Sequence, residues 1–331
     1  MRATFLAKKM LEYLCILLIV ISINFLLIHL MPGEPLLHIL GEEDYYYLLY
    51  QHPDHLAALG AAYGLQEPLW VQYVQYVKSI GSLDFGTSFV QQGTVLEIIL
   101  RHARWTLTLV LPAIVIAAVL GILLGGYAGW TRGGRIDTIF SFLSTALYTV
   151  PENSVAILLL VGFSYQLGWF PVGGIRSGQE TGWGSGIDTV WHMLLPLSVL
   201  VLYKTVYNFF ILKSSIVEIR REEYMTTAYA KGLSDFAVFW RHGLKNALLP
   251  YLTVLCLQFG HAVAGTMLLE VVFSWQGMGI LVYQSVLAKD IPILQGCFLL
   301  LSVGVLGFNF LADLLYVVWD PRIGTDGEQH D

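Results

Sequence analysis

Long apolar runs constrain this chain more than any other feature of its sequence. The first extends from Met10 to Leu30, about the length of an α-helix that crosses a bilayer. Later runs of similar length cover residues 105–130, 138–162, 191–212, 247–273 and 296–319. Only 13% of the residues are charged, about half the share found in soluble domains. Because unpaired backbone groups are costly in hydrocarbon, each run must be helical, and we predict an all-α integral membrane protein with six transmembrane helices.

The polar segments between these runs differ in charge. Lys and Arg gather before the first run and in the segments after the second and fourth runs, whereas acids dominate residues 31–104. Since cytoplasmic loops carry an excess of Lys and Arg, we expect both termini to be cytoplasmic. The chain then divides into an N-terminal end with the first helix (1–30), a small extracytoplasmic subdomain (31–104) and a transmembrane core (105–331) with a cytoplasmic loop at 213–247.

Local patterns predict three details of these segments. Apolar residues at helical spacing predict an amphipathic helix over Pro68–Ile80. Thr94-Val-Leu-Glu97 has the form of a capping box, so a helix should begin there and run towards the second apolar run. Pro151-Glu-Asn153 should interrupt the third run. The extracytoplasmic segment is large enough for a small subdomain but hardly for an independent enzyme.

The most polar cytoplasmic segment lies between the fourth and fifth runs. It contains Glu223-Tyr-Met-Thr-Thr-Ala-Tyr-Ala-Lys-Gly-Leu233, followed by Arg241-His-Gly-Leu-Lys-Asn-Ala-Leu-Leu-Pro250. The segment is long enough for two short helices, and Gly232 would let the backbone turn between them. The small side chains of Ala228 and Ala230 would let such a helix seat in a cleft of a partner protein.

The charges of this segment have two interpretations. They could pair with charges on a partner protein, or they could belong to an ordinary solvated loop, because exposed charges usually contribute little. The residues concerned are Glu223, Lys231, Arg241 and Lys245. Their spacing alone leaves both interpretations open.

The two motifs resemble the cytoplasmic EAA coupling loop of ABC importer permeases, in particular the B-type subunit of the dipeptide/oligopeptide/nickel family. Other segments that match this family, in the same order, are Met31-Pro-Gly-Glu-Pro35, Gly64-Leu-Gln-Glu-Pro-Leu-Trp-Val-Gln-Tyr73, Leu83-Asp-Phe-Gly-Thr-Ser88, Glu270-Val-Val-Phe-Ser-Trp-Gln-Gly-Met-Gly279, Asp290-Ile-Pro292 and Asp313 with Asp320-Pro-Arg322. The resemblance implies a fold like that of type I ABC importer permeases, located in the bacterial cytoplasmic (inner) membrane. It implies a pore-forming subunit for peptides or, alternatively, for nickel or a metal chelate.

The resemblance also implies partners. These are a second, C-type permease subunit, two ATPase subunits at the cytoplasmic face, an extracytoplasmic substrate-binding protein and membrane lipid, with no nucleic acid. The chain has no Gly-x-x-x-x-Gly-Lys-Ser/Thr motif, so ATP and Mg²⁺ should bind to the ATPase subunits. We expect this chain to bind no cofactor and to be no enzyme. The residues that the resemblance assigns to ATPase coupling are Glu223, Ala228, Ala230, Lys231, Gly232, Arg241, Lys245 and Pro250.

Polar residues within the apolar runs are candidates for the translocation path. Lys204 lies near the middle of the fourth run, where a charge is a functional candidate by default. It could attract a substrate carboxylate, pair with a carbonyl or an acid, or snorkel to the interface. Glu152 and Asn153 could line a pore, or they could be hydrated at the membrane interface. Gln258 and His261 lie on the fifth run, and a lone histidine there is more often hydrogen-bonded to a neighbour than bound to metal, so we predict no metal site.

Two other protein classes deserve comparison. A secondary carrier would have inverted repeats, and the two halves of this chain do not resemble each other. A membrane-embedded enzyme would need paired catalytic groups at one depth, whereas Glu152, Lys204 and Asp313 fall at three depths of the predicted helices. Asp313, with Asp320 and Arg322, is instead expected to form a structural ion pair or polar anchor at the cytoplasmic end. An importer permease is therefore the leading hypothesis.

Overall fold

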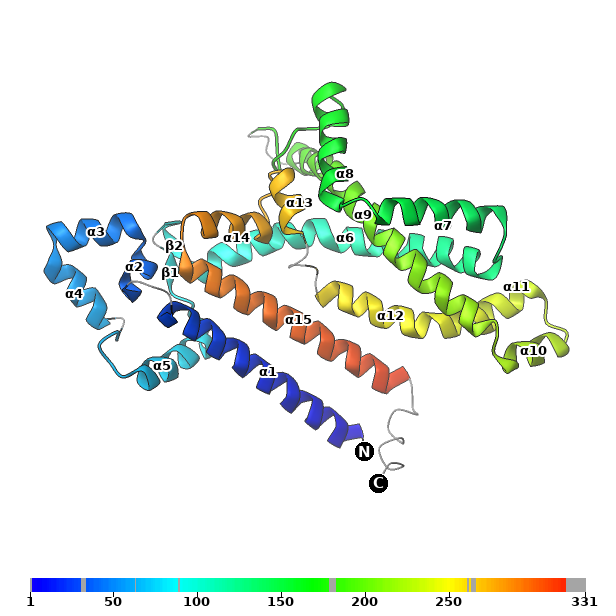
Figure 1. Ribbon diagram of the computed structural model, residues 1–331, viewed down its shortest axis with the longest axis horizontal. Coiled ribbons are helices and arrows are strands. Elements are labelled where there is room, and N and C mark those ends of the chain that lie inside the picture. Colours follow the sequence, from blue (N-terminus) through cyan, green and yellow to red (C-terminus); the bar gives the residue numbers. More distant parts are fainter. Residues whose placement is uncertain are drawn as a thin grey trace.

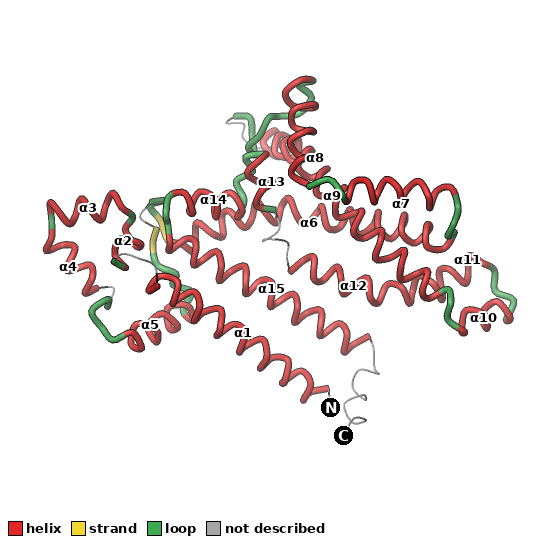
Figure 2. Tube along the Cα trace, in the orientation of Figure 1, coloured by secondary structure: helices red, strands yellow, loops and turns green. Residues whose placement is uncertain are grey.

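A computed structural model describes residues 2–30, 34–62, 64–88, 90–178, 183–260, 262 and 266–319. Figure 1 shows these residues as a bundle of helices, and Figure 2 shows helix along most of the trace. The sheet found within the described residues has only two short strands. The described part of the chain therefore confirms an all-α protein.

Among the described residues, four helices are long and apolar enough to cross a membrane. They are α1 (Arg2–Leu30), α6 (Val95–Trp130), α9 (Trp183–Ile219) and α15 (Ile291–Trp319). A fifth crossing can be formed by α7 (Arg135–Tyr148) together with α8 (Glu152–Leu159) and the π-helical turns of η1 (Leu160–Gln166), which are bent by 94° at the break between them. The predicted interruption at Pro151 is thus confirmed.

The predicted count of six transmembrane helices is not confirmed by this structure. The fifth apolar run is divided between α12 (Lys245–Gly260) and α13 (Met267–Val272), and residues 261 and 263–265 between them lie outside the described residues. The segment that follows contains α14 (Met278–Leu287), a shorter apolar helix.

Helix α6 begins ten residues before the predicted second span. Its first turns bury Val95, Ile98, Ile99 and Ala103 against α14 and α15, so this amphipathic stretch simply extends the membrane helix outwards. Thr94 occupies the N-cap position, as the capping-box pattern predicted, but its side chain makes no capping hydrogen bond. The capping-box pattern therefore predicted the start of the helix correctly, although the capping hydrogen bond itself is not formed.

Helices α6 and α9 pack closely along a row of glycines. A Cβ atom on Gly121 would lie 2.4 Å from Cβ of Asn208, and one on Gly125 would lie 2.7 Å from the carbonyl oxygen of Phe209. Gly129, four residues further on, would place its Cβ 2.9 Å from Ile216. Small residues at a spacing of four let two membrane helices approach to backbone contact, so this row determines how α6 and α9 cross.

The segment that the sequence predicts to be an extracytoplasmic subdomain is built from short elements, of which the first three share a small core of Leu36, Leu40, Tyr45 and Leu56. Its elements are α2 (Pro35–Leu40), α3 (Glu42–Gln51), α4 (Pro53–Ala62), α5 (Leu69–Gly81), β1 (Thr87–Ser88) and β2 (Gly93–Thr94). Helix α5 agrees with the predicted amphipathic helix, and the two strands are antiparallel, with Thr87 opposite Thr94. Figure 1 shows α3 and α4 at the opposite end of the molecule from α10 (Glu223–Ala230) and α11 (Asp235–Val238).

Candidate functional site

The polar segment between α9 and α12 folds into a helical elbow. Helix α10 ends at Ala230, the chain turns through Gly232, and α11 continues through the π-helical turn η2 (Phe239–Leu244) into α12. Gly232 has φ +78°, a left-handed conformation that costs most other residues free energy. Ser234 then caps α11 by accepting a hydrogen bond from the backbone N–H of Ala237 at 3.3 Å. The turn that the glycine predicted is therefore present.

A small apolar core holds this elbow together. Met225 and Ala228 of α10 are buried against Val238 of α11, and Ile219 and Trp130 pack around them. Ala228 is thus an internal packing residue of the elbow, while the neighbouring Ala230 is exposed. The two alanines, which sequence reasoning grouped together, have different surroundings.

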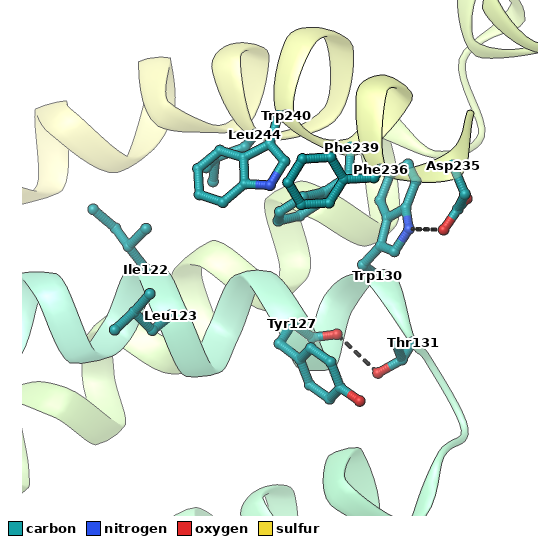
Figure 3. Close-up of a pocket in the computed structure, with 10 residues that line it drawn as sticks. All are labelled: Ile122, Leu123, Tyr127, Trp130, Thr131, Asp235, Phe236, Phe239, Trp240 and Leu244. Atoms are coloured by element: carbon teal, nitrogen blue, oxygen red, sulfur yellow. Dashed lines mark hydrogen bonds between the residues drawn. The ribbon is translucent and has the colours of Figure 1, made fainter. Parts of the chain in front are cut away.

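Trp130, at the C-terminal end of α6, connects the elbow to the long helices. Its indole N–H donates to Asp235 at 2.8 Å, and Figure 3 shows this bond. The Arg220 guanidinium lies 4.9 Å from the centre of the Trp130 ring and donates to its backbone carbonyl. A Cβ on Gly243 would lie 3.0 Å from the ring, so η2 also rests on this side chain. Sequence reasoning missed Trp130, although an aromatic residue between an apolar run and a basic turn is typical of a membrane interface.

Asp235 receives two hydrogen bonds in this arrangement. Besides the Trp130 indole, the Tyr229 hydroxyl donates to it at 2.7 Å. These donors, together with the positive charge of Arg220, hold the pKa of Asp235 below its usual value. The carboxylate therefore stays charged at neutral pH and links α10, α11 and α6.

The outer surface of the elbow is open to solvent in this chain. Nothing lies within 4 Å of a Cβ placed on Gly232. The other exposed residues among those that the resemblance assigned to coupling are Glu223, Ala230, Lys231, Arg241, Lys245 and Pro250. The elbow thus presents mixed charges around a position where a partner can approach the backbone.

An apolar groove of about 460 Å³ lies between the end of α6 and the second half of the elbow. Figure 3 shows Phe236, Phe239 and Trp240 facing Leu123 and Tyr127 across it. The remaining lining residues are Ile122, Trp130, Thr131, Asp235 and Leu244. The groove connects the elbow to the part of α6 that lies in the membrane.

Two of the predicted path residues are brought together at the bend between α7 and α8. The Tyr203 hydroxyl of α9 donates to the carbonyl of Val150 at 2.7 Å, which brings the chain just before α8 to the level of Lys204 on α9. The side chains of Lys204 and Glu152 are both half-buried and act on each other electrostatically. The sequence assigned them to different depths because it predicted an interruption at Pro151 but neither the size nor the direction of the bend there. Asn153 is also half-buried.

Gln258 bonds to a residue that sequence reasoning did not select. Its side-chain amide donates to Asn208 Oδ1 at 2.7 Å, joining α12 to α9, and Asn208 is fully buried. Asn208 Nδ2 and Gln258 Oε1 have no hydrogen-bond partner within the described chain. His261 lies outside the described residues.

Asp313 has a structural role that joins the two ends of the chain. It accepts a hydrogen bond from the Tyr13 hydroxyl at 2.9 Å and lies 3.5 Å from Lys9 Nζ. Helix α1 therefore packs along α15, as Figure 1 shows. The expected polar anchor thus forms with α1, and the expected contributions of Asp320 and Arg322 fall outside the described residues.

Glu270 is the most completely bonded acid in the described chain. It is fully buried, and its oxygens accept from Thr106 at 2.7 Å, Thr266 at 2.9 Å and the backbone N–H of Gly279 at 2.6 Å. The Glu270–Gly279 motif is therefore a turn closed around its own carboxylate and held against α6. Within the described residues, no group of three His, Cys, Asp or Glu side chains is arranged to hold a metal ion.

Comparison with known proteins finds related sequences along nearly the whole chain. Residues 119–325 match the family described as binding-protein-dependent transport system inner membrane component, and residues 2–111 match the N-terminal family of such membrane components. The di/tripeptide transport system permease protein DppB of Pseudomonas aeruginosa is 34% identical over 317 residues, covering 91% of this chain and 93% of the relative.

Two further relatives are similarly complete. The dipeptide transport system permease protein DppB of Alkalihalophilus pseudofirmus is 30% identical over 336 residues, covering 96% of this chain and 98% of the relative. The glutathione transport system permease protein GsiC of Salmonella choleraesuis is 33% identical over 316 residues, covering 96% and 97%. The similarity therefore includes the subdomain, the long helices and the elbow.

Proposed function

This chain belongs to the family of binding-protein-dependent transport system inner membrane components, and from this membership we propose that it is the B-type pore-forming subunit of an ATP-driven importer of short peptides. It is a multi-pass inner-membrane permease with the fold of type I ABC importers. Such a transport system includes a substrate-binding protein and ATPase subunits. Two ATPase subunits, a second C-type permease and cytoplasmic termini complete the proposal.

Peptides are the substrate class that the relatives favour. Their names specify dipeptides, di- and tripeptides, and glutathione, which is itself a tripeptide. These names do not favour nickel or a metal chelate. The chain itself would bind neither ATP nor a cofactor, and its task would be to open and close a path.

The observation that carries this proposal is the exposed elbow formed by α10 and α11. Its first helix follows directly from α9, its second continues into α12, and Trp130 connects it to α6. A force applied to the elbow would therefore reach α6, α9 and α12 at once. We infer that nucleotide binding by the ATPase subunits moves the elbow and thereby rocks these helices between inward-open and outward-open arrangements.

Substitution of Gly232 tests this inference. The left-handed backbone penalises any side chain there, so the control is Gly232→Asn, because asparagine tolerates that conformation. Gly232→Trp meets nothing within this chain that would clash with its Cβ. If an ATPase subunit docks on the elbow, the tryptophan variant should lose ATPase subunits during purification and lose peptide-stimulated ATP hydrolysis, while the asparagine variant keeps both. Normal assembly and stimulation in the tryptophan variant would exclude docking at this turn.

A further inference from the structure

The bend between α7 and α8 places a pair of opposite charges inside the membrane part of the molecule. Lys204 lies close to the middle of α9, and Glu152 opens α8 directly after the 94° bend. The hydrogen bond from Tyr203 to Val150 holds the two helices together at this level. Broken membrane helices commonly border substrate sites, because the break supplies polar groups within hydrocarbon.

The pair is arranged differently from the structural ion pairs of this chain. Lys213 and Asp137 meet at 2.5 Å, and Lys9 and Asp313 at 3.5 Å, whereas Glu152 and Lys204 attract each other without such a contact in the described chain. Both are half-buried, so neither is sealed within the core. An intramembrane charge that is neither directly paired nor fully buried is expected to face a polar cavity or a passing ligand.

We propose that Glu152 and Lys204 form a transient binding site for the two charged ends of a short peptide, with Glu152 receiving the N-terminal ammonium and Lys204 the C-terminal carboxylate. This inference rests on the proposed function, because it requires that peptides pass through this subunit. It adds the two side chains that would recognise the substrate, and the feature that they recognise is a positive and a negative charge on one small molecule.

Charge balance supports this assignment. Without a ligand, the two side chains compensate each other and so reduce the cost of keeping charges in the membrane. A zwitterionic peptide carries the same two charges, so the site stays neutral when it is occupied. On binding, the interaction between Glu152 and Lys204 is replaced by two interactions, one at each end of the peptide. This favours entry without trapping the peptide, as a transport path requires. A peptide with one blocked end would leave one side chain uncompensated.

The test uses the complete transporter in proteoliposomes with saturating wild-type binding protein. Uptake is measured for free dialanine, dialanine amide and N-acetyl-dialanine by wild type, Lys204→Gln and Glu152→Gln. For each peptide, the variant rate is divided by the wild-type rate, so that selection by the binding protein cancels. We expect Lys204→Gln to lower dialanine uptake roughly tenfold while leaving uptake of the amide at the wild-type rate, because the amide has no carboxylate to lose. Glu152→Gln should show the corresponding pattern with the acetylated peptide.

Control variants separate recognition from structure. Lys204→Arg keeps the charge and should restore dialanine uptake, and Tyr207→Phe changes an exposed residue on the same helix and should alter nothing. An equal loss for all three peptides would mean that Lys204 is structural, and unchanged uptake would likewise overturn the inference. If Lys204→Gln fails to assemble, the Glu152→Gln comparison decides alone. Wild-type vesicles that take up none of the peptides would instead refute the proposed function.

Discussion

Glu270 shows how much of this molecule depends on single polar side chains whose partners lie far away in the chain. Its carboxylate accepts a hydrogen bond from Thr106, which is 164 residues earlier, and also binds the backbone N–H of Gly279. A buried carboxylate is tolerated only where donors surround it, so these bonds hold the α13–α14 turn against α6. The side chain acts as an acceptor at every contact.

Glu270→Gln should therefore destabilise the protein. The amide presents an NH₂ group where the carboxylate had an acceptor, so at least one buried donor loses its bond. We expect the free energy of unfolding to fall by about 2 kcal/mol. The measurement is the thermal unfolding midpoint of the purified protein in detergent, with the exposed Glu97→Gln as the matched control. Identical midpoints for both variants would show that the carboxylate is dispensable.

The location and the partners of some functional residues could be predicted from the sequence, and those of others could not. The exposed residues of the elbow belong to two neighbouring motifs of one polar segment, so their location in a common elbow could be expected. Trp130 and Asn208 could not be selected, because Asp235 is 105 residues from Trp130 and Gln258 is 50 residues from Asn208. The proximity of Lys204 to Glu152 could not be predicted for a related reason, because the spacing of residues along the sequence does not determine the direction of a bend.

Among the helices, the contact between α6 and α9 depends on glycine more than on any apolar side chain. Gly121, Gly125 and Gly129 lie on one face of α6, because residues four apart are neighbours on a helix. The second apolar run contains Gly121, Gly125, Gly126 and Gly129 near its end, but only the structure identifies α9 as the helix packed on them. Helix ends were harder to predict than helix existence, because amphipathic turns such as 95–104 extend a membrane helix without a change in backbone.

Gly125→Ala should loosen this contact. The added methyl group would lie 2.7 Å from the Phe209 carbonyl oxygen, so the helices must separate, at a cost of about 1–3 kcal/mol. We expect a lower yield of folded transporter in the membrane and a lower unfolding midpoint. Gly162→Ala is the control, since nothing lies within 4 Å of its Cβ. If Gly162→Ala lowers the yield and the unfolding midpoint as much as Gly125→Ala does, then a general effect of alanine in a helix, and not the α6–α9 contact, causes the loss.

Taken as one body, the protein places a small acidic subdomain and a basic elbow at opposite ends of its long axis (Figure 1). The composition and the positive-inside pattern predicted this division, because both follow from the cost of moving charges across a bilayer. The number of crossings was less predictable. The 247–273 run contains enough apolar residues for a helix, yet only its parts Lys245–Gly260 and Met267–Val272 are described as helical.

The predicted orientation has a direct consequence for chemical labelling. In a background without Cys15, Cys256 and Cys297, we expect Glu43→Cys to react with a membrane-impermeant maleimide added to spheroplasts, because Glu43 is exposed on the subdomain that the orientation predicts to be extracytoplasmic. Lys231→Cys, exposed on the elbow, should react only after the membrane is permeabilised.

Docked ATPase subunits would cover Lys231, so a second cytoplasmic position is needed. Arg132→Cys lies in the short exposed turn between α6 and α7 and should label after permeabilisation whether or not the ATPase subunits are present. Lys231→Cys, in contrast, should label faster when the permease is expressed without them. Labelling of either position in sealed spheroplasts would place the elbow outside the cell, where no nucleotide-driven partner could move it, and both the orientation and the coupling role would then be wrong.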